Sequence, residues 1–348
     1  MKILITGNLG YVGPVVVASL RKSYADATLI GADTGFFAHC LTTREGVPER
    51  LLDVQRLVDI RRLGVDDLGG VDTVVHLAAI SNDPMGKVYE NVTDEINYRA
   101  TVRLARSARE AGARRFVFAS SCSVYGFSGG APCTEESAIN PLTGYARSKS
   151  DAERGLEPLA DQDFVVTCLR FPTACGMSPR LRLDLVLNDF VASAVASGVI
   201  RILSDGTPWR PLIDVKDMAR AIEWAVHRTE ENGGPWLAVN VGHDGCNYRV
   251  KDLADAVKER VPGTAVLLNE HAAADPRSYR VDFGRYAELA PEHLPRVDLS
   301  RSIEELRRGL ELAKFNRRSL NDREFVRLDV LGRFRELGLL NARLEWIA

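Results

Sequence analysis

Short runs of β-branched and apolar residues alternate with longer amphipathic stretches through the first half of the chain. The runs that predict strands are Lys2–Thr6, Thr28–Ala32, Val71–Ala78, Arg115–Ser120 and Asp163–Leu169. Helical spacing is found in Gly13–Lys22 and in the series Ile96, Ala100, Leu104, Ala108 and Ala111. Because the strands are almost continuously apolar and alternate with helices, we expect an α/β fold with a parallel sheet covered on both faces.

The second half of the chain is less regular. Helical periodicity is found in Leu181–Val199, Val215–His227, Asn247–Glu259 and the tail Asp298–Leu337, whereas Trp236–Val241 reads as extended. The sequence contains no internal repeat, low-complexity block or flexible linker. We therefore expect a smaller second α/β lobe that packs tightly on the first.

The strongest local motif is a glycine-rich loop with GxxGxxG spacing, formed by Gly7, Gly10 and Gly13. It follows the first strand and opens a helix, where glycines permit a tight turn and unpaired N–H groups can bind a pyrophosphate. Asp33 lies 20 residues after Gly13 (33 − 13 = 20), where a carboxylate accepts hydrogen bonds from an adenosine ribose. The pattern predicts a dinucleotide site in a doubly wound, Rossmann-like domain. A carboxylate repels a 2′-phosphate, so Asp33 favours NAD over NADP; a plain turn before Gly35 is its alternative role.

Two further segments fit the edge of such a cofactor site. Asp53 follows two leucines, and its carboxylate can accept a hydrogen bond from an adenine amino group. The sequence His76-Leu77-Ala78-Ala79 ends a strand in small residues, past which a flat ring can run. We expect His76 itself to lie in the core.

A YxxxK pattern at Tyr145 and Lys149 places a phenol and an ammonium on one face of a helix. The ammonium is expected to lower the pKa of the phenol, so that a tyrosinate can act as a base near neutral pH. Ser121 lies 24 residues earlier (145 − 121 = 24), at a strand end, where its hydroxyl can hold a substrate oxygen. The YxxxK pattern alone also fits a surface pair on a helix. Together, the three side chains predict a proton transfer coupled to hydride transfer with a nicotinamide.

With these motifs the chain resembles the extended short-chain dehydrogenases/reductases, in particular the NAD-dependent nucleotide-sugar epimerase/dehydratase family and its UDP-glucose 4-epimerase-like members. The matching segments are TGNLGYVG (6–13), Asp33, Asp53, HLAA (76–79), NYRAT (97–101), SSCSVYG (120–126), YARSK (145–149) and WRP (209–211). They span about residues 1–220 in the family's order, and DPRSYR (275–280) resembles a later substrate-phosphate element. The resemblance implies that Ser121, Tyr145 and Lys149 are the catalytic residues.

The same resemblance, with the motifs above, assigns the ligand contacts. Those expected for NAD are Gly7, Gly10, Tyr11, Val12, Gly13, Asp33, Asp53, Val54, Leu77, Ala78, Ala79, Asn97, Tyr145, Lys149 and Phe171. Those expected for a nucleotide diphosphate sugar are Ser121, Ser123, Thr173, Asn188, Arg210 and Arg277. Of these, the two arginines would clamp the diphosphate, whose geometry suits a guanidinium fork.

The resemblance also implies an organisation of the chain. An NAD-binding domain is expected over residues 1–172, to which 215–242 returns, and a substrate-binding lobe over 173–214 and 243–348. A homodimer is expected to pair through the helices around Thr93–Ala111 and Tyr145–Leu159.

The residues after Ser121 narrow the reaction. Dehydratases of the family carry an Asp-Glu pair at the two positions where this chain has Cys122 and Ser123, and decarboxylases rely on the glutamate of that pair. Because this chain lacks both carboxylates, dehydration and decarboxylation are disfavoured. The cysteine base of the family's 3,5-epimerases would stand at Ser123, and we interpret Cys122 as a packed thiol. The expected reaction is C4 epimerisation of a nucleotide diphosphate hexose through a 4-keto intermediate. A 4-ketoreductase and a non-catalytic NAD-binding protein stay open as alternatives.

One departure from the family leaves the sugar open. Thr173 stands where many members have an asparagine that contacts the substrate phosphate. The basic stretch Ser178–Arg182 is a candidate to compensate for this change.

Composition disfavours several other functions. With 45 basic and 47 acidic residues, the 348-residue chain has a net charge of −2, which argues against binding nucleic acid or anionic membranes through bulk charge. No stretch approaches the roughly 18–20 apolar residues of a membrane span. The first apolar run is also too short for a signal peptide. The six cysteines show no CxxC spacing, so we expect no metal site and reduced thiols in a cytoplasmic protein.

Overall fold

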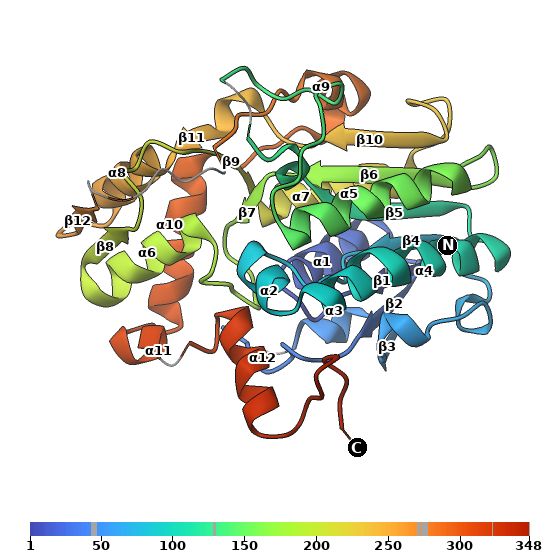
Figure 1. The fold of residues 1–348 in the computed structure, drawn as a ribbon, viewed down its shortest axis with the longest axis horizontal. Coiled ribbons are helices and arrows are strands. Elements are labelled where there is room, and N and C mark those ends of the chain that lie inside the picture. Colours follow the sequence, from blue (N-terminus) through green and yellow to red (C-terminus); the bar gives the residue numbers. More distant parts are fainter. Residues whose placement is uncertain (43–46, 128–129, 270–271, 273–277, 322, 348) are drawn as a thin grey trace.

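Seven parallel strands form the main sheet of the computed structural model, which describes residues 1–42, 47–127, 130–269, 272, 278–321 and 323–347 (Figure 1). The strands are β1 (Lys2–Thr6), β2 (Thr28–Asp33), β3 (Val54–Leu57), β4 (Thr73–His76), β5 (Arg115–Ser121), β6 (Val165–Phe171) and β10 (Trp236–Asn240). Their order across the sheet is β10-β6-β5-β4-β1-β2-β3, and every neighbouring pair is parallel. The prediction of a doubly wound α/β fold is therefore confirmed.

Helices cover both faces of this sheet. The first face packs against α1 (Gly13–Ser23) and α7 (Val215–His227), which also contact each other. The second face packs against the segment that contains α2 (Asp83–Val88), α3 (Glu90–Asp94), a π-helical turn (Glu95–Ala100), α4 (Thr101–Glu110) and α5 (Gly144–Leu156). All residues of β4 and β6 are buried, as their apolar runs indicate. The edge strand β3 was not predicted, because it is short and half exposed and lacks an apolar run.

The second lobe has its own small sheets and apolar core. β7 (Thr173–Cys175), β9 (Trp209–Asp214) and β11 (Asn247–Arg249) form one sheet, and β8 (Val199–Ile202) pairs with β12 (Ala265–Leu268). Their core is shared with α6 (Val186–Ser197), α8 (Val250–Arg260) and α10 (Leu299–Leu312). Residues 215–242 leave this lobe to supply α7 and β10 to the layers of the main sheet.

The last part of the chain differs from its expected course. The continuous helical tail is divided into α10, α11 (Arg317–Asn321) and α12 (Arg327–Glu336). The residues from α12 onward return to the first domain, where Leu331, Leu340 and Leu344 are buried in the core beside the main sheet (Figure 1). The short helix α9 (Gly284–Leu289) also packs on the main sheet, through Tyr286. The assignment of all residues 243–348 to the substrate lobe is thus wrong for these segments, because helical periodicity does not reveal which core a helix joins.

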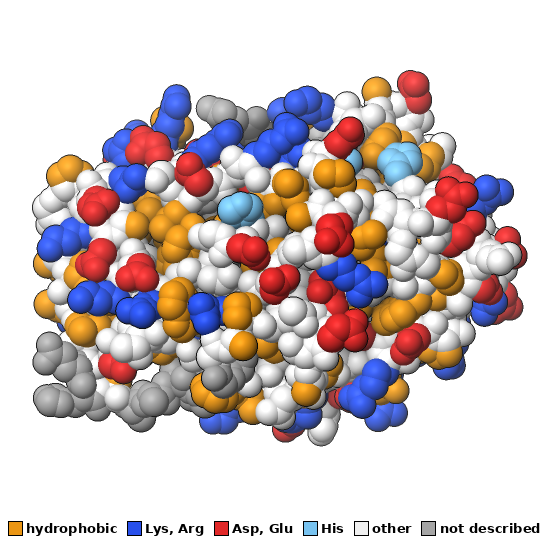
Figure 2. All heavy atoms as spheres, turned by 90° about the horizontal axis from the view of Figure 1, so that it is seen from above, with side chains coloured by type: hydrophobic (Ala, Val, Ile, Leu, Met, Phe, Trp, Pro, Cys, Tyr) orange, Lys and Arg blue, Asp and Glu red, His pale blue; other side chains and the backbone are white. Residues whose placement is uncertain are grey.

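The surface carries charges of both signs. On the face that Figure 2 shows, basic and acidic side chains are interspersed, in keeping with the small net charge. Exposed large apolar side chains such as Leu57, Leu203 and Leu312 come from separate elements. Among the described residues, no helix is both long and apolar enough to cross a membrane.

A glycine on α5 tests how tightly the helical layer is packed. A Cβ at Gly155 would lie 2.5 Å from a methyl carbon of Val102 on α4, whereas a Cβ at Gly332 on α12 would meet no atom within 4 Å. We expect Gly155→Ala to destabilise the protein by about 1–3 kcal/mol through overpacking. Gly332→Ala should instead stabilise it by about 1 kcal/mol through helix propensity. Urea denaturation of both variants measures the difference, and equal stabilities would contradict the close packing of α5.

Candidate active site

A cavity of about 920 Å³ lies at the carboxyl ends of the main-sheet strands, where the second lobe meets them. Its volume is at the upper end of the range for ligand sites. The predicted residues in its wall are Gly7, Gly10, Tyr11, Val12, Asp33, Leu77, Ala78, Ala79, Ser121, Ser123, Tyr145, Lys149, Phe171, Thr173 and Arg210. Side chains that are far apart in the sequence meet here because the strands of a parallel sheet all end at one edge. Arg277 lies outside the described residues.

The glycine loop lies against the end of β4. Gly7 has a φ of +74°, and a Cβ there would lie 2.6 Å from the backbone nitrogen of Ala78. A Cβ at Gly13 would lie 2.3 Å from the carbonyl oxygen of Asn8, so only glycine lets α1 begin this close to the loop. Gly13 itself is not in the cavity wall and shapes the loop from behind. No side chain caps the N-terminus of α1, which suits an anion site.

Asp33 ends β2 at the rim of this loop. Its carboxylate accepts hydrogen bonds from the backbone N–H of Leu9 (3.0 Å) and of Gly35 (2.8 Å). Burial raises the pKa of Asp33, and these two hydrogen bonds oppose that change. The carboxylate makes the turn before Gly35 and also lines the cavity. A carboxylate beside a glycine-rich loop at a helix N-terminus fits NAD, with Asp33 toward the adenosine ribose and the loop toward the pyrophosphate.

The predicted adenine contact is placed elsewhere. Asp53 lies before β3, at the opposite end of the strand from the cavity, and binds the guanidinium of Arg21 at 2.6 Å. Neither Asp53 nor Val54 lines the cavity, so their assignment to the cofactor is wrong. Asp59 and Ile60, just after the carboxyl end of the same strand, line it instead. The error follows from the unrecognised strand, because the position of β3 decides which of the two aspartates lies at the ligand edge.

Asn97 and Asn188, which the sequence predicts as ligand contacts, hold residues of the cavity wall in place but do not line the cavity themselves. Asn97 exchanges two hydrogen bonds with the backbone of Ile80, at 2.8 and 2.9 Å. Asn188 accepts a hydrogen bond from the N–H of Gly176 (3.0 Å) and donates one to the hydroxyl of Tyr11 (3.2 Å). Both asparagines are buried and neither lines the cavity, whereas Ile80 and Tyr11 do. Their predicted ligand contacts are therefore corrected to a positioning role.

Tyr145 lies in the first turn of α5, whose N-terminus is capped by the side chain of Thr143. Burial raises the pKa of Tyr145 to about 12, although a hydrogen bond with Ser121 lowers it in part. Lys149 lies one turn further on, with its Nζ 5.9 Å from the centre of the Tyr145 ring. The Nζ donates to the carbonyl oxygen of Ala119 at 2.7 Å. The structure thus brings together the three predicted catalytic side chains.

The pKa values of Tyr145 and Lys149 differ from those expected from the sequence. Burial lowers the pKa of Lys149 to about 7, so near neutral pH its charge is only partly present. Lys149 therefore does not offset the burial of Tyr145, and the predicted lowering of the phenol pKa is wrong for the protein without its cofactor.

A buried ion pair holds α5 in place. Glu153 follows Lys149 at the next i, i+4 position, and its carboxylate binds the guanidinium of Arg170 on β6 at 2.7 and 3.0 Å. It also accepts a hydrogen bond from Ser120, which precedes Ser121 on β5. Both charged side chains are less than a tenth exposed. Since loss of one partner of a buried pair costs about 3–5 kcal/mol, the pair fixes α5 firmly against the two strands.

The two residues after Ser121 have different surroundings. The thiol of Cys122 is buried and donates to the carbonyl oxygen of Arg170 at 3.1 Å, and burial raises its pKa well above the usual value. It is therefore a poor base, in line with its interpretation as a packed thiol. Ser123 lines the cavity. Its Oγ has no hydrogen-bond partner among the described residues. This Oγ is itself buried, beneath the surface of the wall.

The wall also contains Arg182, which belongs to the basic stretch Ser178–Arg182. Arg182 binds Asp184 through two nitrogens at 2.9 Å and donates to the hydroxyl (2.9 Å) and carbonyl (3.0 Å) of Ser81. Its charge lowers the pKa of Tyr145. Arg180, its neighbour in the same basic stretch, pairs with Glu49 instead. The sequence shows the basic stretch but not which arginine turns into the cavity. Over the described part of the chain, no group of His, Cys, Asp and Glu side chains is arranged to hold a metal ion.

Comparison with known proteins defines the class. Residues 3–242 match the model of the NAD dependent epimerase/dehydratase family. The chain belongs to this family, as its motifs predicted, and is an enzyme with NAD as its cofactor.

Several relatives are similar over most of their length. YtcB of Bacillus subtilis (strain 168), described as an uncharacterized UDP-glucose epimerase, is 30% identical over 70% of this chain and 77% of its own. UDP-glucose 4-epimerase of Corynebacterium glutamicum is 29% identical over 74% of this chain and 80% of its own. The solved structure of MoeE5 in complex with UDP-glucuronic acid and NAD is 26% identical, with a TM-score of 0.75 over 90% of this chain and 100% of that one. TunA, an NDP-hexosamine 5,6-dehydratase, has a TM-score of 0.77 over 89% and 98% at 20% identity, which shows the shared fold.

The ionisation of Tyr145 can be measured directly. Its pKa of about 12 lies above the usual value of about 10, so in the protein stripped of NAD the neutral phenol should persist to higher pH than that of a tyrosine in water. We expect the absorbance of tyrosinate at 295 nm, taken as wild type minus Tyr145→Phe, to show no step below about pH 11. A step near neutral pH in the NAD-free protein would show that burial does not control this group.

Proposed function

We propose that the protein is a 4-epimerase of a nucleotide diphosphate hexose, with a UDP-hexose as the first candidate substrate. The observation that carries this proposal is the group formed by Ser121, Tyr145 and Lys149 in the cavity wall, followed by Cys122 and Ser123 in place of acidic residues. Relatives named UDP-glucose 4-epimerase, which are 26–29% identical over about three quarters or more of this chain, support it.

In this proposal, the C4 hydroxyl of the hexose lies between Ser121 and Tyr145. Ser121 holds the oxygen, and Tyr145 removes its proton as a general base. Lys149, fixed by its hydrogen bond to the carbonyl of Ala119, stabilises the tyrosinate when protonated. NAD, held by the glycine loop and Asp33, would supply reversible hydride transfer at C4. Tyr145 gives its proton back when the 4-keto sugar presents its other face, so the reaction consumes no cofactor.

The substrate end of the cavity is proposed to hold the diphosphate and the sugar. Arg210 comes from β9 and Thr173 from β7, and both line this end. Arg210 is proposed to bind the diphosphate together with Arg277. Ser123 is proposed to contact the sugar.

A 4-ketoreductase acting on a nucleotide sugar is the alternative. It needs the same catalytic side chains but consumes reduced cofactor in each turnover. A dehydratase is less favoured, because Cys122 is packed against the backbone and Ser123 has no acidic group. The two leading reactions therefore differ in whether turnover requires added cofactor.

We also propose a homodimer that pairs through α4 and α5, as the family resemblance implies. Arg99 and Arg109 on the exposed side of this helical layer pair with Asp94 and Asp161 of the same chain, so these two charges are compensated without a partner chain. Sedimentation velocity at micromolar concentration should give a dimer, and a monomer alone would overturn this proposal.

The catalytic proposal predicts the effect of removing one hydroxyl. Tyr145→Phe should lower the rate of conversion of UDP-glucose to UDP-galactose by at least about 100-fold, because the general base is lost. It should keep its NAD content, since the hydroxyl is not needed to fold the cofactor domain. The control Tyr24→Phe, at the opposite end of α1 from the glycine loop and outside the cavity wall, should behave as wild type.

The assay is run on purified protein without added cofactor, and the products are separated by chromatography. Epimer formation under these conditions supports the epimerase. Conversion of a 4-keto sugar nucleotide only after addition of NADH would favour the reductase instead. Wild-type epimerisation by Tyr145→Phe would overturn the assigned role of this residue.

A further inference from the structure

One end of the cavity is formed by two loops that belong to the cofactor domain. The loop after β2 supplies Thr34, Phe36 and Phe37, and the loop after β3 supplies Asp59 and Ile60. This end also contains Asp33, so in the proposed placement of NAD it receives the adenosine. Both loops are supported from outside by residues 327–347, the last described segment of the chain.

The first support is Trp346. Its indole N–H donates to the carbonyl oxygen of Thr34 at 2.7 Å. Its ring lies against Phe36, with 5.6 Å between ring centres, and against Phe334 of α12, at 5.2 Å. Phe36 is almost fully buried, whereas Trp346 is 44% exposed. The tryptophan therefore covers the outer side of a residue whose inner side faces the cavity.

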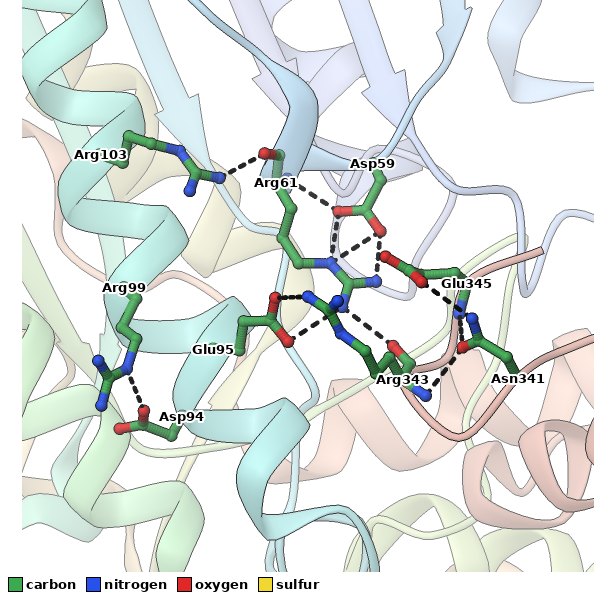
Figure 3. Close-up of polar contacts among 9 residues, drawn as sticks. All are labelled: Asp59, Arg61, Asp94, Glu95, Arg99, Arg103, Asn341, Arg343 and Glu345. Atoms are coloured by element: carbon green, nitrogen blue, oxygen red, sulfur yellow. Dashed lines mark hydrogen bonds and ion pairs between the residues drawn. The ribbon is translucent and has the colours of Figure 1, made fainter. Parts of the chain in front are cut away.

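The second support is a polar network around Arg61, which Figure 3 shows. The guanidinium of Arg61 binds the carboxylate of Asp59 at 2.6 and 3.0 Å, and donates to the carbonyl oxygen of Arg343 at 3.0 Å. Arg343 in turn pairs with Glu95, which Arg61 also contacts at 3.3 Å. The side chain of Asn341 accepts from the backbone N–H of Arg343 at 2.8 Å and so holds the turn that presents this carbonyl. Asp59 is thus tied to the last segment through a single buried arginine.

Packing fixes the last segment in one conformation. Leu340 and Leu344 are buried in the same core as Phe36 and Ile60. Leu344 adopts a left-handed backbone with φ +54°, which costs about 1–2 kcal/mol for a residue with a Cβ. Such a conformation persists where the surrounding structure determines it. The segment is therefore built into the domain rather than laid over it.

We propose that residues 339–347 support the cofactor site from outside. In this arrangement Trp346 and the Arg343 carbonyl position the loops after β2 and β3, at the adenosine end of the cavity. They act through Thr34, Phe36 and Arg61. The ligand concerned is NAD, through its adenosine half. The inference rests on the placement of adenosine at Asp33 and Asp59, but not on the identity of the sugar or on the reaction.

The physical consequence concerns how tightly NAD is retained. Loops that are already ordered lose less conformational freedom when a ligand binds, so support from outside raises affinity without a direct contact. Removal of the Trp346 ring leaves the Thr34 carbonyl to water and uncovers Phe36. The loops then gain freedom mainly in the NAD-free protein, and NAD should dissociate faster.

The test measures NAD binding separately from catalysis. We expect Trp346→Ala to raise the dissociation constant of NAD about tenfold, which corresponds to about 1.4 kcal/mol, and to leave the affinity for UDP unchanged. Trp346→Phe keeps the ring against Phe36 but loses the N–H, and should recover part of the affinity. Isothermal titration of the NAD-stripped full chain, first with NAD and then with UDP, gives both values.

A second variant acts through the other loop. Asn341→Ala loosens the turn that presents the Arg343 carbonyl to Arg61, and should weaken NAD binding in the same direction. The matched control is Ile347→Ala, since Ile347 is 54% exposed and its backbone N–H bonds to Leu339 rather than to a cavity loop. Unchanged NAD affinity in both folded test variants would overturn the proposal. So would an equal loss of NAD and UDP affinity, because that result indicates a general loss of structure.

Two measurements separate this inference from the proposed function. If the wild-type protein binds NAD but converts no sugar nucleotide, the proposed reaction fails and the inference stands on its binding data. If Asp33→Asn binds NAD as tightly as wild type, the placement of adenosine is wrong and the inference falls with it.

Discussion

The common direction of the seven main-sheet strands is the constraint on which the rest of the structure depends. Because all strands end at one edge, the loops that follow β1, β2, β4, β5 and β6 meet around a single cavity. The same edge holds the N-terminus of α1, which no side chain caps and which is therefore suited to bind an anion. An antiparallel arrangement would send alternate loops to opposite ends of the sheet. The glycine loop and the group formed by Ser121, Tyr145 and Lys149 therefore line one cavity because of strand direction.

A buried ion pair on α5 fixes the position of this helix at the same edge of the sheet. Tyr145, Lys149 and Glu153 follow one another at i, i+4 spacing, and the last of them is tied to Arg170 and to Ser120. A buried ion pair is weak evidence for stability, because apolar side chains of similar volume often stabilise a core as well. What the pair contributes here is position, since it fixes α5 against the two strands that end beside the cavity. The same burial shifts the pKa values of Tyr145 and Lys149 away from the values that YxxxK spacing suggests.

The chain crosses between its two lobes more than once, and each crossing adds to the cavity wall. Residues 173–214 leave the main sheet to form the substrate end, and α7 and β10 return to it. Residues 327–347 return again and support the loops at the opposite end. The two ends of the cavity are thus built from segments that are distant in sequence. Changes in the last segment can reach the cofactor site without any direct contact with the ligand.

The sequence by itself determined the elements whose information is local. A glycine loop after a strand, an acidic residue at the end of the next strand, and YxxxK spacing on a helix each depend on near neighbours and on backbone sterics. These predicted the fold class, the family, NAD and the three side chains that meet in the cavity wall, Ser121, Tyr145 and Lys149. The same motifs carry the resemblance to the family, and that resemblance predicted a nucleotide sugar as the class of substrate.

Only the tertiary structure decided the features that depend on distant partners. Whether Asp53 or Asp59 lies at the ligand edge depends on where β3 pairs with β2, and no apolar run marks that strand. Asn97 and Asn188 proved to hold the wall from behind, because their hydrogen-bond partners come from other elements. The return of α12 to the first domain was equally hidden, since an amphipathic helix shows that it has a buried face but not against which core that face packs.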